Sequence, residues 1–120
     1  LTDKLKYKNK YKNKYIDIFI HLYMEFDKPG LNTFTIYSKS GCPNCRKVKS
    51  LLSEMKLKFR VIDCDEYLVD SKDDFLQFIY EITHKNIKIF PVVFDSNNYI
   101  GGFLETQAYL NVMLDFDTNF

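Results

Sequence analysis

Cys42 and Cys45, two cysteines three residues apart, are the side chains of this sequence whose type and spacing point most directly to chemistry. They lie in the segment SKSGCPNC, residues 38–45. Two thiols at this spacing lie on one face of a helix, where they can close a disulfide bond and open it again. We therefore interpret the pair as a candidate redox centre.

The sequence around Cys42 favours ionisation of its thiol. Alternating aromatic and β-branched residues at 34–37 predict a strand before it, and apolar residues at helical spacing between 48 and 55 predict a helix after it. The free N–H groups and the dipole at a helix start favour a negative sulfur by up to about 2 kcal/mol. Since one pKa unit corresponds to about 1.4 kcal/mol, the helix alone lowers a thiol pKa of about 8.5 by less than two units. We expect Lys39 and hydrogen bonds from the Cys45 side to supply the rest.

Pro43 and Cys45 support the same placement. A proline ring presets the backbone angle of a first helical residue, and its missing N–H is no loss there. Cys45 lies one turn further on and faces the same side as Cys42. These residues place Cys42 at the N-terminus of a helix.

A zinc site is the main structural alternative for a Cys-x-x-Cys pair. Zinc usually takes four Cys or His ligands, with a second pair at short spacing. Only Cys64, His21 and His84 remain, and they are scattered, so we expect no metal. An unreactive, structural pair of thiols is a second alternative. We interpret Cys64 as a small buried apolar residue and the histidines as structural or exposed.

Length and composition indicate one globular domain. The chain has 120 residues, of which 46% are hydrophobic and 17% aromatic. Its three cysteines are an odd number and no secretion signal accompanies them, which argues against an extracellular disulfide scaffold. We expect a reducing, cytoplasmic location.

Residues 1–14 form a basic arm. They carry six Lys and one Asp, a charge of +5, while the whole chain has a net charge of +1 and residues 15–120 therefore carry −4. Alternating Lys and Tyr could neutralise phosphates and stack on bases in a nucleic acid. We favour a solvated, flexible arm over residues 1–14 followed by the folded domain over residues 15–120, with no nucleic-acid partner.

The apolar run at residues 16–24 does not resemble a membrane segment. Asp17 and His21 interrupt it, it is too short to span a bilayer, and no cleavage site follows. Its apolar residues recur at helical spacing, which predicts an amphipathic helix that ends at residues 28–30. We expect this helix to pack on the domain, and we expect no membrane partner.

The remaining pattern predicts an alternation of helices and strands. The predicted elements are a strand over 59–64, a helix over 73–83, a hairpin of strands 91–94 and 99–100 with a turn at 95–98, and a last amphipathic helix with Ala108, Leu110, Met113 and Leu114 on its apolar face. Two of the strands form a βαβ crossover and two form a hairpin. This order predicts a mixed four-stranded sheet covered by helices.

This order of elements resembles the glutaredoxins, within the thioredoxin fold. Three features carry the resemblance: the CPNC segment after the first strand, Pro91 before the third, and Gly101-Gly102 after the fourth. It covers residues 16 to 115 approximately and is closer to the dithiol class because Cys45 is present. It implies an α/β thioredoxin-like fold, with the mixed four-stranded sheet flanked by helices and preceded by an N-terminal helix.

The resemblance also implies a glutathione site beside Cys42. In the family the proline is cis and the residue before it pairs its backbone with the glutathione cysteine, which here indicates Pro91 and Phe90. Lys39 and Lys88 stand where the family carries basic residues that can pair with the glycine carboxylate. Asn44, where the dithiol motif usually has Tyr, would form one wall.

The same resemblance places the γ-glutamyl end of glutathione at the last helix. The backbone N–H groups of Gly102, Phe103 and Leu104 would receive the glutamyl carboxylate, and Glu105 would meet the ammonium group. The family commonly has Asp or Ser at the position of Leu104.

The function implied is that of a glutathione-dependent thiol-disulfide oxidoreductase. Cys42 would attack protein disulfides and protein–glutathione mixed disulfides, Cys45 would resolve the protein-linked intermediate, and glutathione would restore the dithiol. The implied partners are glutathione and disulfide-containing or glutathionylated proteins, with ribonucleotide reductase a common client of the family. We expect a monomer.

Two other functions are consistent with the same residues. One is a glutathione-assisted iron-sulfur cluster carrier, in which Cys42 and glutathione from two subunits hold the cluster. The other is a thioredoxin-like reductase fed by a flavoprotein. Thioredoxins usually carry Trp before the motif and Gly-Pro within it, whereas this chain has no Trp and has Pro43-Asn44.

Overall fold

The computed structural model describes residues 25–118 of the chain. The basic arm at 1–14 and the apolar run at residues 16–24, which predicted an amphipathic helix, lie outside the described residues. The elements are β1 (Phe34–Ser38), α2 (Pro43–Glu54), β2 (Phe59–Asp63), α3 (Asp65–Asp70), α4 (Lys72–Thr83), β3 (Val92–Asp95), β4 (Asn98–Gly101) and α5 (Phe103–Thr118). None of the helices in this part of the chain is long and apolar enough to cross a membrane.

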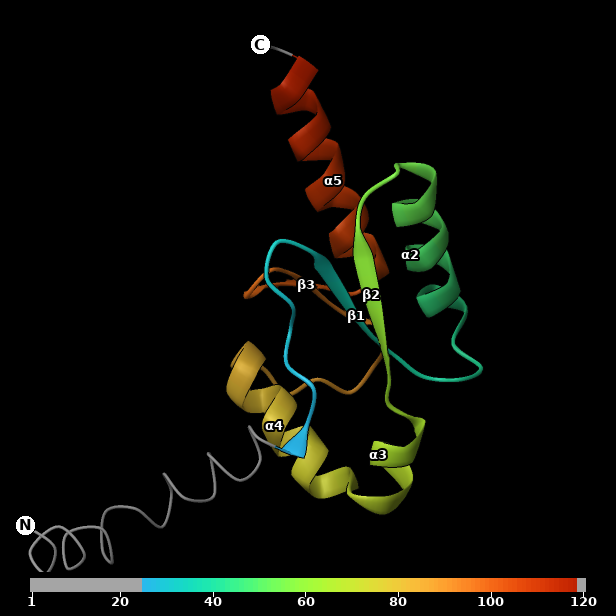
Figure 1. Ribbon diagram of the computed structural model, residues 1–120, viewed down its shortest axis with the longest axis vertical. Helices are drawn as coiled ribbons and strands as arrows, with labels where there is room; N and C mark the ends of the chain where they lie inside the picture. Colours follow the sequence, from blue (N-terminus) through green and yellow to red (C-terminus); the bar gives the residue numbers. More distant parts are fainter. Residues whose placement is uncertain (1–24, 119–120) are drawn as a thin grey trace, which may run out of the picture.

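The four strands form one mixed sheet in the order β2-β1-β3-β4 (Figure 1). Strand β1 pairs parallel with β2 and antiparallel with β3, so that Ile36 lies between Val61 and Val93. Strands β3 and β4 form an antiparallel hairpin. The structure thus confirms the predicted βαβ crossover, through α2, and the predicted hairpin.

Helices cover both faces of the sheet. Side chains alternate along the inner strand β1, so this strand contributes apolar residues to both faces. Phe34 and Ile36 point to one face, where they pack with Val48 of α2 and Leu110 of α5. Tyr37 points to the other face, where it joins an aromatic cluster with residues of α4 such as Phe75.

Helix α2 begins at Pro43, as predicted from Pro43 and the apolar residues that follow it. Helix α3 was not predicted: at six residues it is too short for a periodic pattern to show, although Tyr67 and Leu68 pack against the aromatic cluster.

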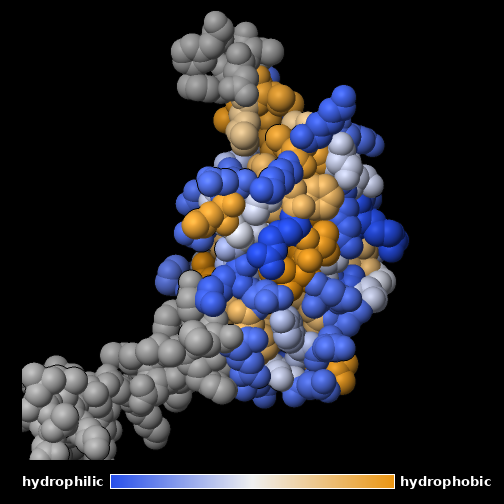
Figure 2. Space-filling view, in the orientation of Figure 1, coloured by the Kyte–Doolittle hydropathy of each residue, from blue (hydrophilic) through white to orange (hydrophobic). Residues whose placement is uncertain are grey.

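The predicted apolar face of α5 is confirmed at Leu110 and wrong at the other three residues. Leu110 is buried, but Ala108, Met113 and Leu114 are exposed, and Val112 is exposed as well. Figure 1 shows the reason: the second half of α5 extends past the sheet, so no part of the described body covers it. Figure 2 shows apolar surface at this outer end of the helix.

Candidate functional site

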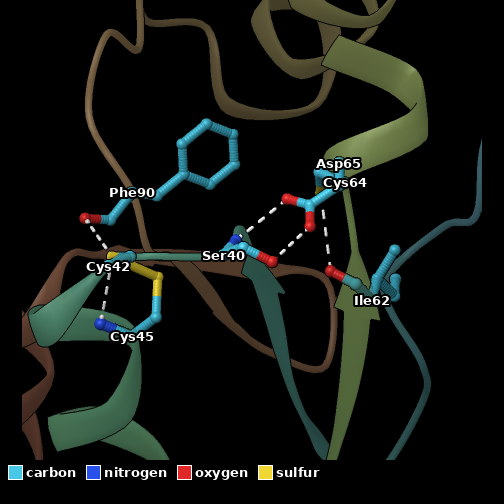
Figure 3. Close-up of a disulfide and its surroundings, with 7 residues drawn as sticks. All are labelled: Ser40, Cys42, Cys45, Ile62, Cys64, Asp65 and Phe90. Carbon is cyan, nitrogen blue, oxygen red and sulfur yellow. Dashed lines mark hydrogen bonds between the residues drawn. A yellow bond between two sulfur atoms is a disulfide. The ribbon is translucent and has the colours of Figure 1, made fainter. Parts of the chain in front are cut away.

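Cys42 and Cys45 form a disulfide bond at the start of α2, with their Cα atoms 5.3 Å apart (Figure 3). Cys42 is the N-cap residue, Pro43 is the first residue of the helix, and Cys45 lies two residues further along. The sequence prediction of a disulfide-forming pair at a helix N-terminus is confirmed.

The local environment of the Cys42 sulfur favours a thiolate when the disulfide opens. The backbone N–H of Cys45 donates a hydrogen bond to Cys42 Sγ at 3.2 Å. The positive end of the α2 dipole lies at the same place, and the first turn of α2 contains no acidic residue. A negative sulfur at Cys42 is therefore stabilised by the helix start, as the sequence predicted.

The two sulfurs differ in access. The side chain of Cys42 is 7% exposed whereas that of Cys45 is fully buried, so Cys42 is the one that a substrate can reach. Cys42 lies in a hollow of about 270 Å³. The other residues that line this hollow are Lys39, Gly41, Pro43, Asn44, Lys88, Ile89 and Phe90.

The loop before β3 forms the opposite wall of this hollow. The Phe90-Pro91 peptide bond is cis, as the resemblance implied. The carbonyl oxygen of Phe90 lies 3.5 Å from Cys42 Sγ, and the ammonium of Lys39 lies 5.7 Å from the centre of the Phe90 ring. The structure thus brings together Lys39, Asn44, Lys88 and Phe90 around Cys42, with Pro91 buried beside them.

The predicted residues at the start of α5 do not line this hollow. The carboxylate of Glu105 accepts a hydrogen bond from the Gly102 N–H at 3.1 Å. Glu105 therefore caps its own helix, in the manner of the third residue of a capping box, and occupies one of the N–H groups predicted to receive a ligand carboxylate. Phe103 is half-buried with Lys47 over its ring, and Leu104 is exposed.

Of the two glycines before α5, Gly101 is the one whose backbone favours glycine. Its φ is +141°, and a Cβ atom at this position would lie 2.6 Å from Glu105 Cβ. The close approach lets the Glu105 side chain fold back over the helix start. The glycine pair therefore serves the cap of α5.

Ser40 and Asp65 form a contact that the sequence analysis missed. The carboxylate of Asp65, the first residue of α3, accepts hydrogen bonds from the Ser40 N–H at 2.9 Å and from the Ser40 hydroxyl (Figure 3). These bonds lower the pKa of Asp65, and the charge of Lys39 adds to the effect. The parallel pairing of β1 with β2 is the signal that could have revealed the contact, because it places the residues after both strands at the same edge of the sheet.

Cys64 is buried and takes no part in the disulfide. Its thiol donates a hydrogen bond to the carbonyl oxygen of Ile62 at 3.5 Å. Burial raises the pKa of Cys64 to about 12, because the thiolate would lose its hydration. The interpretation of Cys64 as a small buried apolar residue is confirmed.

The histidines and acidic residues of the described part do not gather around a metal site. His84 is exposed and ends α4 in the left-handed conformation, and His21 lies outside the described residues. Within residues 25–118, no group of three or more His, Cys, Asp or Glu side chains could hold a metal ion.

Comparisons with known proteins agree with this geometry. The family model described as Glutaredoxin matches residues 34–100. Glutaredoxin 1 of Rickettsia conorii is 27% identical over 94 residues, which cover 74% of this chain and 87% of that protein. The crystal structure of glutaredoxin 1 from Francisella tularensis complexed with cacodylate has a TM-score of 0.60 at 26% identity and covers 69% of this chain and 96% of that one. The buckwheat glutaredoxin-glutathione complex has the same fold, with a TM-score of 0.61 at 19% identity, over 79% of this chain and 84% of that one.

Proposed function

The chain belongs to the glutaredoxin family of thiol-disulfide oxidoreductases, and we propose that it uses glutathione to reduce protein disulfides and protein–glutathione mixed disulfides. The observation that carries this proposal is the asymmetry of the cysteine pair. Cys42 combines partial access with an N–H donor to its sulfur, whereas Cys45 is fully buried. The sulfur of Cys42 is thus suited to attack a substrate, and the buried sulfur of Cys45 is suited to attack the disulfide that Cys42 has formed.

The hollow around Cys42 has groups that suit glutathione. A cysteine residue bound to Cys42 Sγ would lie beside the backbone of Phe90, whose carbonyl oxygen already approaches this sulfur. Lys39 and Lys88 line the same hollow and can pair with the glycine carboxylate. The buckwheat glutaredoxin in the comparison was solved as a glutathione complex, which supports the same ligand here.

The proposed reaction with a glutathionylated protein has two exchanges. The Cys42 thiolate attacks the glutathione sulfur, so that a Cys42–glutathione disulfide forms and the protein leaves as a thiolate, which water protonates. A second glutathione thiolate then attacks this disulfide, releasing glutathione disulfide and the Cys42 thiolate. In the net exchange, the protein–glutathione disulfide and one free glutathione become a protein thiol and glutathione disulfide, so one free glutathione is consumed in each turnover.

Reduction of a protein disulfide requires Cys45 in addition to Cys42. Cys42 attacks one sulfur of the substrate, and the Cys45 thiolate then displaces that sulfur from Cys42, which closes the disulfide bond present in the structure. Two glutathione molecules reopen this bond. We place the reaction in the cytoplasm, where a reducing environment keeps glutathione available, and keep ribonucleotide reductase as a candidate client.

Turnover of the mixed disulfide between glutathione and 2-mercaptoethanol tests the proposal. With glutathione, glutathione reductase and NADPH, the protein should consume NADPH in proportion to its concentration. With thioredoxin reductase and NADPH in place of the glutathione system, consumption should stay at the background rate. The reverse pattern would indicate a thioredoxin-like reductase and would overturn the proposal.

A further inference from the structure

A second hollow, of about 310 Å³, adjoins the hollow that contains Cys42. The two share Lys39, Lys88 and Phe90 as a common wall. The far side of the second hollow is formed by α3 and α4, through residues such as Leu68 and Lys72. A chain attached to Cys42 through a disulfide can therefore extend directly into it.

The second hollow is strongly basic. Lys39, Lys72 and Lys88 line it, and no acidic residue does. Asp73, the neighbour of Lys72 in sequence, lines a different hollow, and Asp65 is held by Ser40. Three positive charges on one concave surface attract a negatively charged ligand.

Apolar side chains form the remainder of this surface. Leu68, Leu76, Ile87 and Phe90 line it, and all four are only partly buried. Leu68, Ile87 and Phe90 pack against the aromatic cluster that includes Phe75 of α4, which holds them in place. The hollow thus offers a preformed apolar floor between basic walls, and an apolar group that covers it gains by leaving water.

Glutathione accounts for only part of these features. In the proposed function its single glycine carboxylate is matched by Lys39 and Lys88. Glutathione has no apolar side chain to cover Leu76 and Leu68, and it leaves Lys72 without a counterpart. A protein substrate can supply both an additional carboxylate and an apolar side chain.

We propose that the second hollow is a docking site for the protein client, and that it selects clients in which acidic and apolar side chains flank the target cysteine. The proposal rests on the proposed function and defines its substrate class. Lys72 is the residue specific to client docking, since it lies outside the hollow that contains Cys42.

Three synthetic peptides with one intramolecular disulfide bond test the selection, because Cys42 then becomes attached to the peptide itself. In the first, Glu and Leu flank both cysteines; in the second, Lys replaces each Glu; in the third, Ser replaces each Leu. We expect kcat/KM for the first peptide to exceed that for the second by at least about fivefold, because each exposed charge pair contributes a factor of up to about five. The preference should shrink at high salt, and the third peptide should also react more slowly than the first.

Lys72→Glu is the informative variant, with Lys58→Glu as its control. Lys58 is exposed and lies between α2 and β2, outside both hollows, so the control makes the same change of net charge. Lys72→Glu should abolish or reverse the preference for the acidic peptide, and it should leave turnover of the glutathione–mercaptoethanol disulfide within about twofold of the unmodified protein. Lys58→Glu should change neither.

The outcomes separate the two proposals. Turnover of the small mixed disulfide without any preference among the peptides would overturn the docking site and leave the proposed function standing. An equal loss of preference in both Lys variants would also overturn it, since net charge alone would then explain the effect. Absence of turnover on the small disulfide would overturn both proposals.

Discussion

The carboxylate of Asp65 accepts hydrogen bonds from the backbone N–H and the hydroxyl of Ser40, and so anchors the loop that leads to Cys42. The two residues are 25 positions apart in sequence but follow adjacent parallel strands, β1 and β2. Ser40 is two residues before Cys42, and Lys39 comes directly before Ser40. The start of α3 thereby fixes the segment that presents both the reactive sulfur and a basic side chain.

Asp65→Asn should make the stability of the protein less dependent on pH. The folded state lowers the pKa of Asp65, so this carboxylate contributes stability above its unfolded pKa of about 4, and the contribution is lost as the pH falls through the lower folded pKa. We therefore expect a lower Tm for the variant at pH 7 and no difference near pH 2. Thermal unfolding followed by circular dichroism across this range measures the effect.

Asp70→Asn is the matched control for this experiment. Asp70 lies at the opposite end of α3 and is exposed, where a negative charge does not favour the helix. This variant should not reproduce the pH-dependent loss of Tm. If Asp65→Asn has the same Tm as the unmodified protein at pH 7, the contact with Ser40 does not stabilise the fold.

Cys64 should resist alkylation in the folded, reduced protein. Its pKa is raised to about 12, so at pH 8 only on the order of one molecule in ten thousand carries the reactive thiolate. After reduction and brief treatment with iodoacetamide at pH 8, mass spectrometry should find the label on Cys42 and none on Cys64. Cys64 should become labelled once urea unfolds the protein. Equal labelling of both residues in the native state would show that Cys64 is accessible and ionised.

Leu110 and Val112 on α5 should respond very differently to truncation. Leu110 is 1% exposed and lies in the core between the sheet, α2 and its own helix α5. Val112, two residues further along α5, is 69% exposed. Leu110→Ala should lower the free energy of unfolding by about 2–5 kcal/mol, and Val112→Ala should change it by less than about 0.5 kcal/mol. Urea denaturation of both variants measures the difference. Similar losses in the two variants would mean that α5 is packed along its whole length.

The sequence predicted the parts of the fold that have a strong local pattern. Alternation at Phe34–Tyr37 indicated β1, and the combination of Pro43 with the following apolar residues indicated the start of α2. Periodicity could not predict which face of α5 is buried, because Met113 and Leu114 are apolar but lie beyond the edge of the sheet. Local pattern says what a helix can bury, whereas tertiary structure decides what it does bury.

In the candidate site too, some residues could be predicted from the sequence and others depend on tertiary structure. Cys42, Cys45 and Lys39 were found from their types and spacing, and Lys88 from the resemblance to the glutaredoxins. The Ser40–Asp65 contact and the place of Lys72 depend on strand pairing and on the position of α4, which single-residue patterns do not reveal. Glu105 was predicted as a ligand residue because of its place after the glycine pair, but its carboxylate caps α5.

The division of labour between Cys42 and Cys45 is the central claim, and separate serine variants test it most directly. The measurement is turnover of the glutathione–mercaptoethanol disulfide and of a protein disulfide, both with glutathione, glutathione reductase and NADPH. Since Cys42 is the accessible sulfur and Cys45 acts from a buried position, Cys42→Ser should lose both activities. Cys45→Ser should keep the first activity and lose most of the second. Full turnover of the small disulfide by Cys42→Ser would contradict the account.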